Sequence, residues 1–274
     1  MPEPAVVPLA RIAGLVGALA APAQRDLVAR NQQRVGGSYL RGPALQRAVL
    51  GAYTSYARYW LESFRLPNHS DRKVDEGHDV VGFDHVLRAR EAGRGVILAL
   101  PHLGGWEWSA FWLARIENIK VTAVVEPLEP AELFEWFVSF RRSLGMNIVP
   151  LGPEAGREVL AALKRNEIVC LLADRDLAGT GIDVDFFGER TTLPAGPATL
   201  AFRSGAPLLP TAVYFRKGFG HLGVVQPPID LSRQSSLRDD IGRATQDLAA
   251  AFEVLIRAAP EQWHLFQRNW PSDG

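Results

Sequence analysis

Apolar and polar residues follow two different patterns along the chain, and the pattern changes after residue 66. Before that point the apolar positions recur at helical spacing, as in residues 43–64, and Leu66-Pro67 ends the stretch. From residue 79 onward, short β-rich apolar runs alternate with amphipathic segments. The predicted strands are 95–100, 121–126, 147–151, 168–173 and 208–215, and the predicted helices are 83–91, 106–117, 130–144, 154–165 and 194–203.

Strands that alternate with helices predict an α/β fold with a mostly parallel central sheet and helices on both faces, preceded by an N-terminal helical segment. No repeat or long linker divides the chain. We therefore expect one domain, in which residues 1–66 form a helical, membrane-associating segment and residues 67–274 form the α/β core. In such sheets a ligand site lies beyond the carboxyl ends of the strands.

Charge is distributed unevenly, although 30 basic and 30 acidic residues cancel over the 274 residues. Residues 1–65 contain eight arginines against three acids and carry +5, and the remainder carries −5. The balanced total gives no sign of a nucleic-acid partner. A basic N-terminal third fits an anionic membrane surface, and a solvated helical face explains the charge equally well.

The first predicted helix repeats apolar residues at Leu9, Ile12, Val16 and Leu19. Its apolar stretch, within residues 5–23, is interrupted and too short to cross a bilayer, so we expect no spanning helix. We also expect no secretory signal peptide. Two interpretations remain open, an interfacial helix on a membrane and a helix packed on the protein body.

The strongest candidate for chemistry is His102, directly after the predicted strand 95–100. Glu107 lies one turn into the next helix, from where its carboxylate could fold back onto the imidazole. A carboxylate on one ring nitrogen leaves the other free as a general base for an alcohol. Gly104 and Gly105 would leave room for the acceptor. A structural histidine near a helix start is the alternative.

The segment 92–108, with its His-x4-Glu motif, resembles the lysophospholipid-type acyltransferase superfamily. It looks in particular like the branch containing lipid A late acyltransferases and actinobacterial phosphatidylinositol mannoside acyltransferases. Matching elements cover nearly the whole chain: residues 56–62, Arg141 with Gly145, residues 173–176, residues 185–188, Thr192, residues 260–263 and residues 268–270. In the mannoside enzymes the acidic residue of the element that matches residues 173–176 is usually Glu, whereas here it is Asp174.

The resemblance implies a role for each matching polar residue. His102 would be the general base and Glu107 its orienting partner. Arg141 would contact the acceptor's polar head or stabilise the oxyanion, unless it is a surface arginine. Asp174 would bind a sugar hydroxyl, unless it caps a helix or pairs with Arg175, which is also a predicted substrate-binding residue. Thr192 would shape the acyl groove or cap the next helix.

The predicted function is transfer of a long-chain acyl group from acyl-CoA to a mannose hydroxyl of a phosphatidylinositol mannoside, at the cytoplasmic face of the cell membrane. A lipid A-type or other glycolipid acyltransferase that uses acyl carrier protein is the first alternative. A non-catalytic lipid-binding protein of the same fold is the second. The expected partners are acyl-CoA as co-substrate, a glycolipid acceptor and an anionic membrane surface.

We expect neither a cofactor nor a metal. The six histidines are too scattered to indicate a zinc site. The chain has no GxGxxG, GxxxxGK[ST] or GxSxG motif, which disfavours dinucleotide binding, P-loop chemistry and a serine hydrolase. The single cysteine, Cys170, lies in an apolar run and is expected to pack rather than react.

Overall fold

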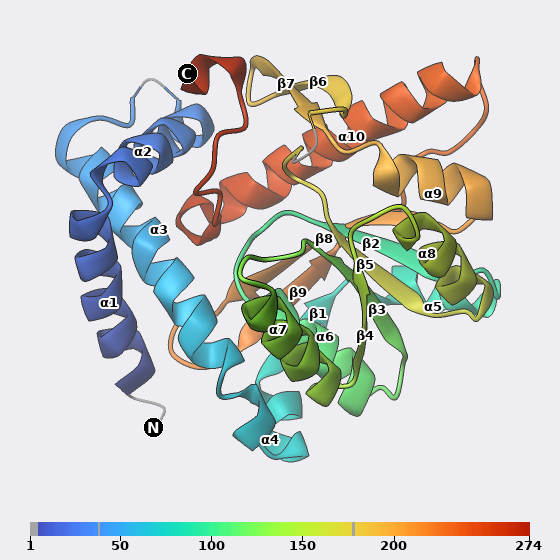
Figure 1. The fold of residues 1–274 in the computed structure, drawn as a ribbon, viewed down its shortest axis with the longest axis horizontal. Coiled ribbons are helices and arrows are strands. Elements are labelled where there is room, and N and C mark those ends of the chain that lie inside the picture. The colour runs from blue at the N-terminus through green and yellow to red at the C-terminus, as the bar shows by residue number, and fades with distance from the viewer. Residues whose placement is uncertain (1–4, 38, 177–178) are drawn as a thin grey trace.

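The computed structural model describes residues 5–37, 39–176 and 179–274. Residues 1–4, which begin the predicted N-terminal segment, lie outside the described residues. The fold is built on a seven-stranded sheet of order β1-β9-β8-β2-β5-β3-β4 (Figure 1). Its strands are β1 (His78–Val81), β2 (Val96–Leu100), β3 (Val121–Val125), β4 (Met146–Pro150), β5 (Ile168–Leu172), β8 (Leu208–Phe215) and β9 (His221–Val225). Within this sheet, among the described residues, β8 and β9 pair antiparallel and all other neighbouring strands pair parallel.

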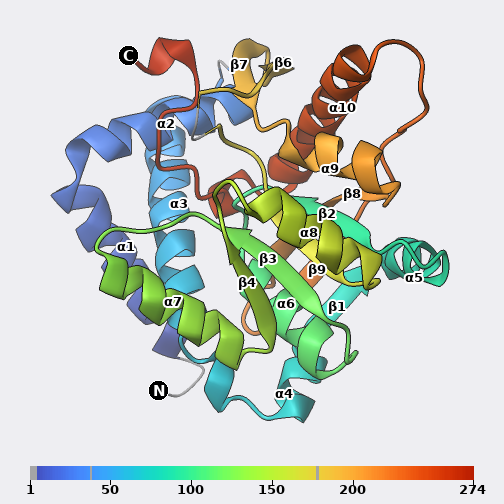
Figure 2. The ribbon, with the colours of Figure 1, turned by 45° about the vertical axis from the view of Figure 1, so that its right-hand side comes forward.

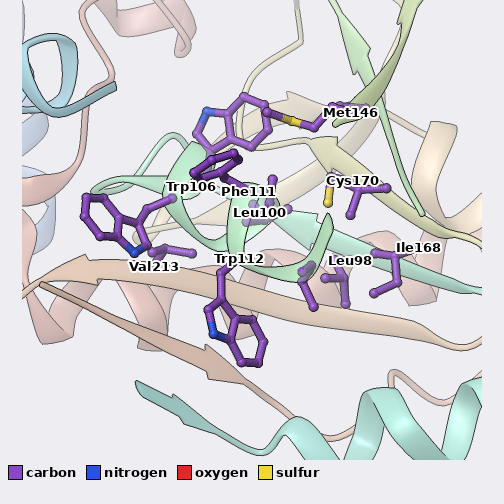
Figure 3. Packing of buried hydrophobic residues seen from close by; sticks show 14 of the residues in the cluster. Leu98, Leu100, Trp106, Phe111, Trp112, Met146, Ile168, Cys170 and Val213 are labelled. Carbon is purple, nitrogen blue, oxygen red and sulfur yellow. The ribbon is translucent and has the colours of Figure 1, made fainter. Parts of the chain in front are cut away.

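The two central strands are apolar throughout because helices cover both of their faces. Leu98 of β2 pairs in register with Cys170 of β5, and both side chains belong to the core on one face (Figure 3). Ile97 and Ala99 point to the opposite face and belong to a second core. Successive side chains of a strand alternate between faces, so a five-residue apolar strand serves both cores.

The helices fall into two layers on this sheet. Helices α5 (Phe83–Glu91), α6 (Trp106–Arg115) and α7 (Ala131–Ser143) contribute to the core that contains Leu98. Helices α8 (Ala155–Lys164), α9 (Gly196–Ser204) and α10 (Leu237–Ala258) contribute to the core that contains Ile97. A separate antiparallel hairpin, β6 (Ile182–Phe186) and β7 (Glu189–Leu193), lies against α10.

Three N-terminal helices precede the sheet: α1 (Val6–Ala20), α2 (Pro22–Gly36) and α3 (Gly42–Ser63). Figures 1 and 2 show them on the side of the molecule away from α5. Gly14 lets α1 approach α3 closely, because a Cβ there would lie 2.7 Å from backbone atoms of Thr54. Among the described residues no single helix is long and apolar enough to cross a membrane, and α1 and α2 meet that requirement only as a pair bent by 109°.

The predicted fold class is confirmed, and each strand and helix predicted from the pattern is present within a few residues of its expected bounds. The structure adds a short helix α4 (Asp71–Glu76), the strands β1, β6, β7 and β9, and α10. Helix α10 could have been found, because Ser236 caps its first turn by accepting from the Asp239 amide at 3.2 Å. The short strand β1 mixes polar and apolar residues and gives little signal.

Candidate active site

His102 lies at the carboxyl end of β2, in a loop that packs closely on the sheet because it contains two glycines. Gly104 has a φ of +58°, and a Cβ there would lie 1.8 Å from the Val213 carbonyl oxygen. A Cβ on Gly105 would lie 2.5 Å from His221 Nε2. Both glycines therefore allow close packing of the loop, whereas the sequence suggested that they make room for an acceptor.

The partner of His102 is Asp174, which follows the neighbouring strand β5. His102 Nδ1 lies 2.5 Å from Asp174 Oδ1, and the His102 backbone N–H donates to Oδ2 at 3.0 Å. Strands β2 and β5 are parallel and in register to their ends, with Leu100 opposite Leu172. Residues that follow such strands meet at the same sheet edge, where the topology predicts a site.

Asp174 is completely buried, and its carboxylate is held in the ionised form. Burial raises the pKa of Asp174, but the charge of His102 and the hydrogen bonds from His102 and Trp263 together keep the pKa below its usual value. The His102 side chain is 23% exposed. Its other ring nitrogen, Nε2, has no hydrogen-bond partner in the described part of the chain. The pair therefore fixes one imidazole nitrogen and leaves the other free to accept a proton.

Glu107 does not contact His102, contrary to the sequence expectation. Its Oε1 accepts a hydrogen bond from Arg141 Nη2 at 3.0 Å and a second from the Tyr59 hydroxyl. Glu107 is only 1% exposed, and none of its hydrogen bonds within the described ranges reaches the imidazole. The first turn of α6 points this carboxylate at α7 and α3 instead. A carboxylate does contact the His102 imidazole, but it is that of Asp174, in the loop after β5.

Arg141 was expected to contact the acceptor or stabilise an oxyanion, and the structure places it in a buried ion pair. Its side chain is 13% exposed and lies over the rings of Trp106 and Phe137, 5.3 and 5.6 Å from their centroids. Burial lowers the pKa of Arg141, but Glu107 and Tyr59 outweigh burial and raise it. This arginine therefore joins α7 to α6 as a permanent cation.

The other two predicted substrate-binding residues, Arg175 and Thr192, make separate polar contacts. Arg175 Nη2 lies 3.0 Å from Glu126 Oε2, and its side chain also donates to Gln267. Thr192 neither caps α9 nor joins His102, because its hydroxyl donates to Asp176 Oδ2 at 2.9 Å. Asp176 also accepts from the Gly181 amide at 2.7 Å and so links the loop after β5 to the β6–β7 hairpin.

Sequence reasoning gave no role to three residues that touch the His102–Asp174 pair. Trp263 Nε1 donates to Asp174 Oδ2 at 2.8 Å, and Asn269 Nδ2 donates to the Asp174 carbonyl at 3.2 Å. The His264 amide donates to the His102 carbonyl at 2.7 Å. Trp263 and Asn269 had only the family resemblance of residues 260–263 and 268–270 as a sequence signal, and His264 had none.

Two other kinds of chemistry find no support in the described residues. No group of three or more His, Cys, Asp or Glu side chains there could hold a metal ion. Burial raises the pKa of the Cys170 thiol to about 12, so this cysteine is not a ready nucleophile.

Comparison with known proteins identifies the family. Residues 1–272 match the family of bacterial lipid A biosynthesis acyltransferases. The chain belongs to this family. The resemblance inferred from the His-x4-Glu segment and the motifs around it is thereby confirmed, and the chain is an acyltransferase.

Individual relatives agree with this assignment. The chain is 41% identical to a phosphatidylinositol mannoside acyltransferase of Mycolicibacterium smegmatis over 97% of its own length and 88% of the relative's. It is 43% identical to a protein of the same name from Mycobacterium tuberculosis over 80% of this chain and 69% of that one. The lipid A biosynthesis palmitoleoyltransferase of Escherichia coli is 23% identical over 93% of this chain and 82% of the relative.

Proposed function

We propose that this acyltransferase moves a long-chain acyl group from acyl-CoA to a mannose hydroxyl of a phosphatidylinositol mannoside, with His102 as general base and Asp174 as its orienting partner. The observation that carries the mechanism is the 2.5 Å contact between His102 Nδ1 and the buried Asp174 carboxylate. The acceptor is inferred from the two mycobacterial relatives, which are 41% and 43% identical to the chain.

The reaction requires one group that first accepts and later returns a proton. His102 Nε2 takes the proton of the acceptor hydroxyl while the oxygen attacks the thioester carbonyl. Asp174 stabilises the imidazolium that forms. The tetrahedral intermediate then expels the thiolate, which receives the proton from His102. The nucleophile belongs to the acceptor, so the mechanism needs no serine or cysteine of the protein.

An apolar pocket beside α6 supports a long-chain acyl donor. Its free volume is small, about 30 Å³, so an acyl chain would have to part the side chains that line it. Its lining includes Leu98, Leu100, Trp106 and Val213, all of which appear in Figure 3. Leu100 ends β2 and Trp106 begins α6, so the lining flanks the loop that carries His102. An apolar lining beside this loop suits an acyl chain better than a polar ligand.

The proposal is tested by incubating the purified protein with palmitoyl-CoA or palmitoyl acyl carrier protein and purified phosphatidylinositol mannoside. Mass spectrometry of the lipids should detect mannose acylation with the CoA donor and little product from His102→Ala. Preference for the carrier-protein donor, or for a lipid A precursor as acceptor, would overturn the donor or acceptor assignment. No turnover of any thioester would favour the non-catalytic alternative.

We also propose that α1 binds the cytoplasmic face of the cell membrane peripherally. Its outer face exposes Ile12, Val16 and Leu19, which are 61%, 60% and 68% exposed. Arg11 and Arg25 are exposed on and after the same helix. Apolar residues on one helical face with nearby cations are typical of interfacial helices.

A matched pair of substitutions tests this membrane contact. Ile12→Asp places a charge on the face of α1, and Val254→Asp places one at a residue that is equally exposed, 60%, on α10. We expect Ile12→Asp to weaken binding to anionic vesicles at least about tenfold, because a charge must enter the interface. Val254→Asp should bind like the unaltered protein. Equal binding by both variants, or binding insensitive to salt, would contradict the proposal.

A further inference from the structure

The C-terminal segment that follows α10 forms one wall of the His102–Asp174 pair. It runs beside α2 and α3 towards the C-terminus (Figure 1), and Asn31 of α2 donates to the Leu265 carbonyl at 2.9 Å. Three hydrogen bonds join the segment to the pair, one from Trp263, one from the His264 amide and one from Asn269.

The bond from Trp263 differs from the other two because it reaches the carboxylate itself. Asp174 Oδ2 accepts from the Trp263 indole at 2.8 Å and from the His102 amide at 3.0 Å. These two donors occupy Oδ2 and leave Oδ1 directed at His102 Nδ1, 2.5 Å away. Asp174 is 0% exposed and Trp263 1% exposed, so solvent does not replace a lost donor easily.

We propose that Trp263 is a positioning residue whose indole N–H holds the Asp174 carboxylate in the orientation that fixes the His102 imidazole. An indole N–H only donates, so this bond always favours the ionised carboxylate. The inference rests on the proposed catalytic role of His102 and Asp174. Trp263 is not itself placed to contact a substrate, because its buried ring packs against Phe187 and Trp270.

Loss of the indole donor has a consequence that a general loss of packing does not. Removing a hydrogen bond to a carboxylate lets it bind a proton more tightly. The groups that face Asp174 are His102 from the β2 loop and His264 from the tail, and its neighbour Arg175 is paired with Glu126. Burial and the charge of His102 lower the pKa of His264 to about 3, so this imidazole stays neutral near neutral pH. In a plot of rate against pH, the rate falls on the acid side when the His102–Asp174 pair binds a proton. This acid limb therefore moves to higher pH when the indole donor is lost.

The test compares Trp263→Phe with Trp270→Phe. Both substitutions keep an aromatic ring and remove one indole N–H from the same cluster, but Trp270 donates to the Phe186 carbonyl at 3.3 Å instead of to Asp174. We expect Trp263→Phe to lower kcat about 10- to 100-fold with KM nearly unchanged, since hydrogen bonds to charged groups are among the stronger ones. The acid limb should rise by about one pH unit. Trp270→Phe should keep the original limb.

An unchanged acid limb in Trp263→Phe, or an equal shift in Trp270→Phe, would overturn the inference. If Trp263→Phe fails to fold, replacing Trp263 with benzothienylalanine keeps the ring shape and removes only the donor, and the same shift is expected. His102→Ala serves as the reference for the mechanism. If that variant stays active, the proposed function fails. If it is inactive while the donor-free variants behave normally, only the role of Trp263 fails.

Discussion

Two buried carboxylates lie near the same edge of the sheet, and they have opposite uses. Asp174 contacts His102, whose side chain is 23% exposed. Glu107 contacts Arg141, whose side chain is 13% exposed, and the Tyr59 hydroxyl. Burial and the Glu107 charge raise the pKa of Tyr59 well above its usual value, so this hydroxyl stays a donor. Neither partner of Glu107 exchanges protons near neutral pH.

The partner, rather than the carboxylate, therefore decides what each site can do. A carboxylate beside an imidazole stabilises a charge that appears and disappears during a reaction. A carboxylate beside a guanidinium is neutralised permanently and joins two helices. On this comparison we expect Asp174 to support catalysis and Glu107 to support the arrangement of α6, α7 and α3.

The largest expected effect is that of Asp174→Asn. The amide cannot stabilise the imidazolium and can present the wrong atom to Nδ1, so kcat should fall about 10²- to 10⁴-fold. Sequence reasoning assigned Asp174 to sugar binding, which would spare hydrolysis of acyl-CoA by water. We expect acyl transfer and hydrolysis to fall together, and both rates can be measured in one assay. A loss confined to transfer would restore the sugar-binding role.

Glu107→Gln should lower the free energy of unfolding more than it lowers kcat. It leaves the Arg141 cation buried without a countercharge, and breaking a buried ion pair typically costs about 3–5 kcal/mol. Chemical denaturation should show this loss, and kcat per folded molecule should change less than about tenfold. The double variant Glu107→Gln with Arg141→Met should recover part of the stability.

The opposite result for Glu107→Gln would reverse the comparison. Unchanged stability with a rate loss as large as that of Asp174→Asn would make Glu107 the partner of the base, as the His-x4-Glu spacing first suggested. Thermal unfolding measured beside kcat on the same preparations separates the two outcomes.

This contrast also marks how far the sequence could predict the site. The position of His102 followed from local information, because an apolar run ends immediately before it and parallel strands collect ligands at that edge. The identity of its partner did not. Glu107 is five residues away in sequence, yet Asp174, 72 residues away, forms the contact. The direction of each carboxylate depends on the packing of α6 against α7 and on the pairing of β2 with β5.

The fold was easier to predict than the site because periodicity reports local burial. The helix expected over residues 83–91 is α5 with the same bounds, and residues 168–173 contain β5. The tail that supplies Trp263 and Asn269 has no such periodicity. Its contacts join residues 89 and 95 positions apart in sequence, which no spacing rule relates.

The smallest expected effect concerns His78, an imidazole that has a hydroxyl as its partner where His102 has a carboxylate. Ser109 Oγ lies 3.1 Å from His78 Nε2, and burial together with the charge of His221 lowers the pKa of His78 from 6.5 to about 3. In the unfolded chain His78 therefore binds a proton below pH 6.5, whereas in the folded protein it binds one only at about pH 3. Stability is lost as the pH falls through this window, by about 2 kcal/mol at pH 5 for this one group.

Denaturation of His78→Gln at pH 8 should give the constant packing cost of the substitution. Between pH 8 and pH 5 the gap to the unaltered protein should then narrow by about 2 kcal/mol, because glutamine does not titrate. A gap that stays constant would mean that His78 accepts its proton in the folded state.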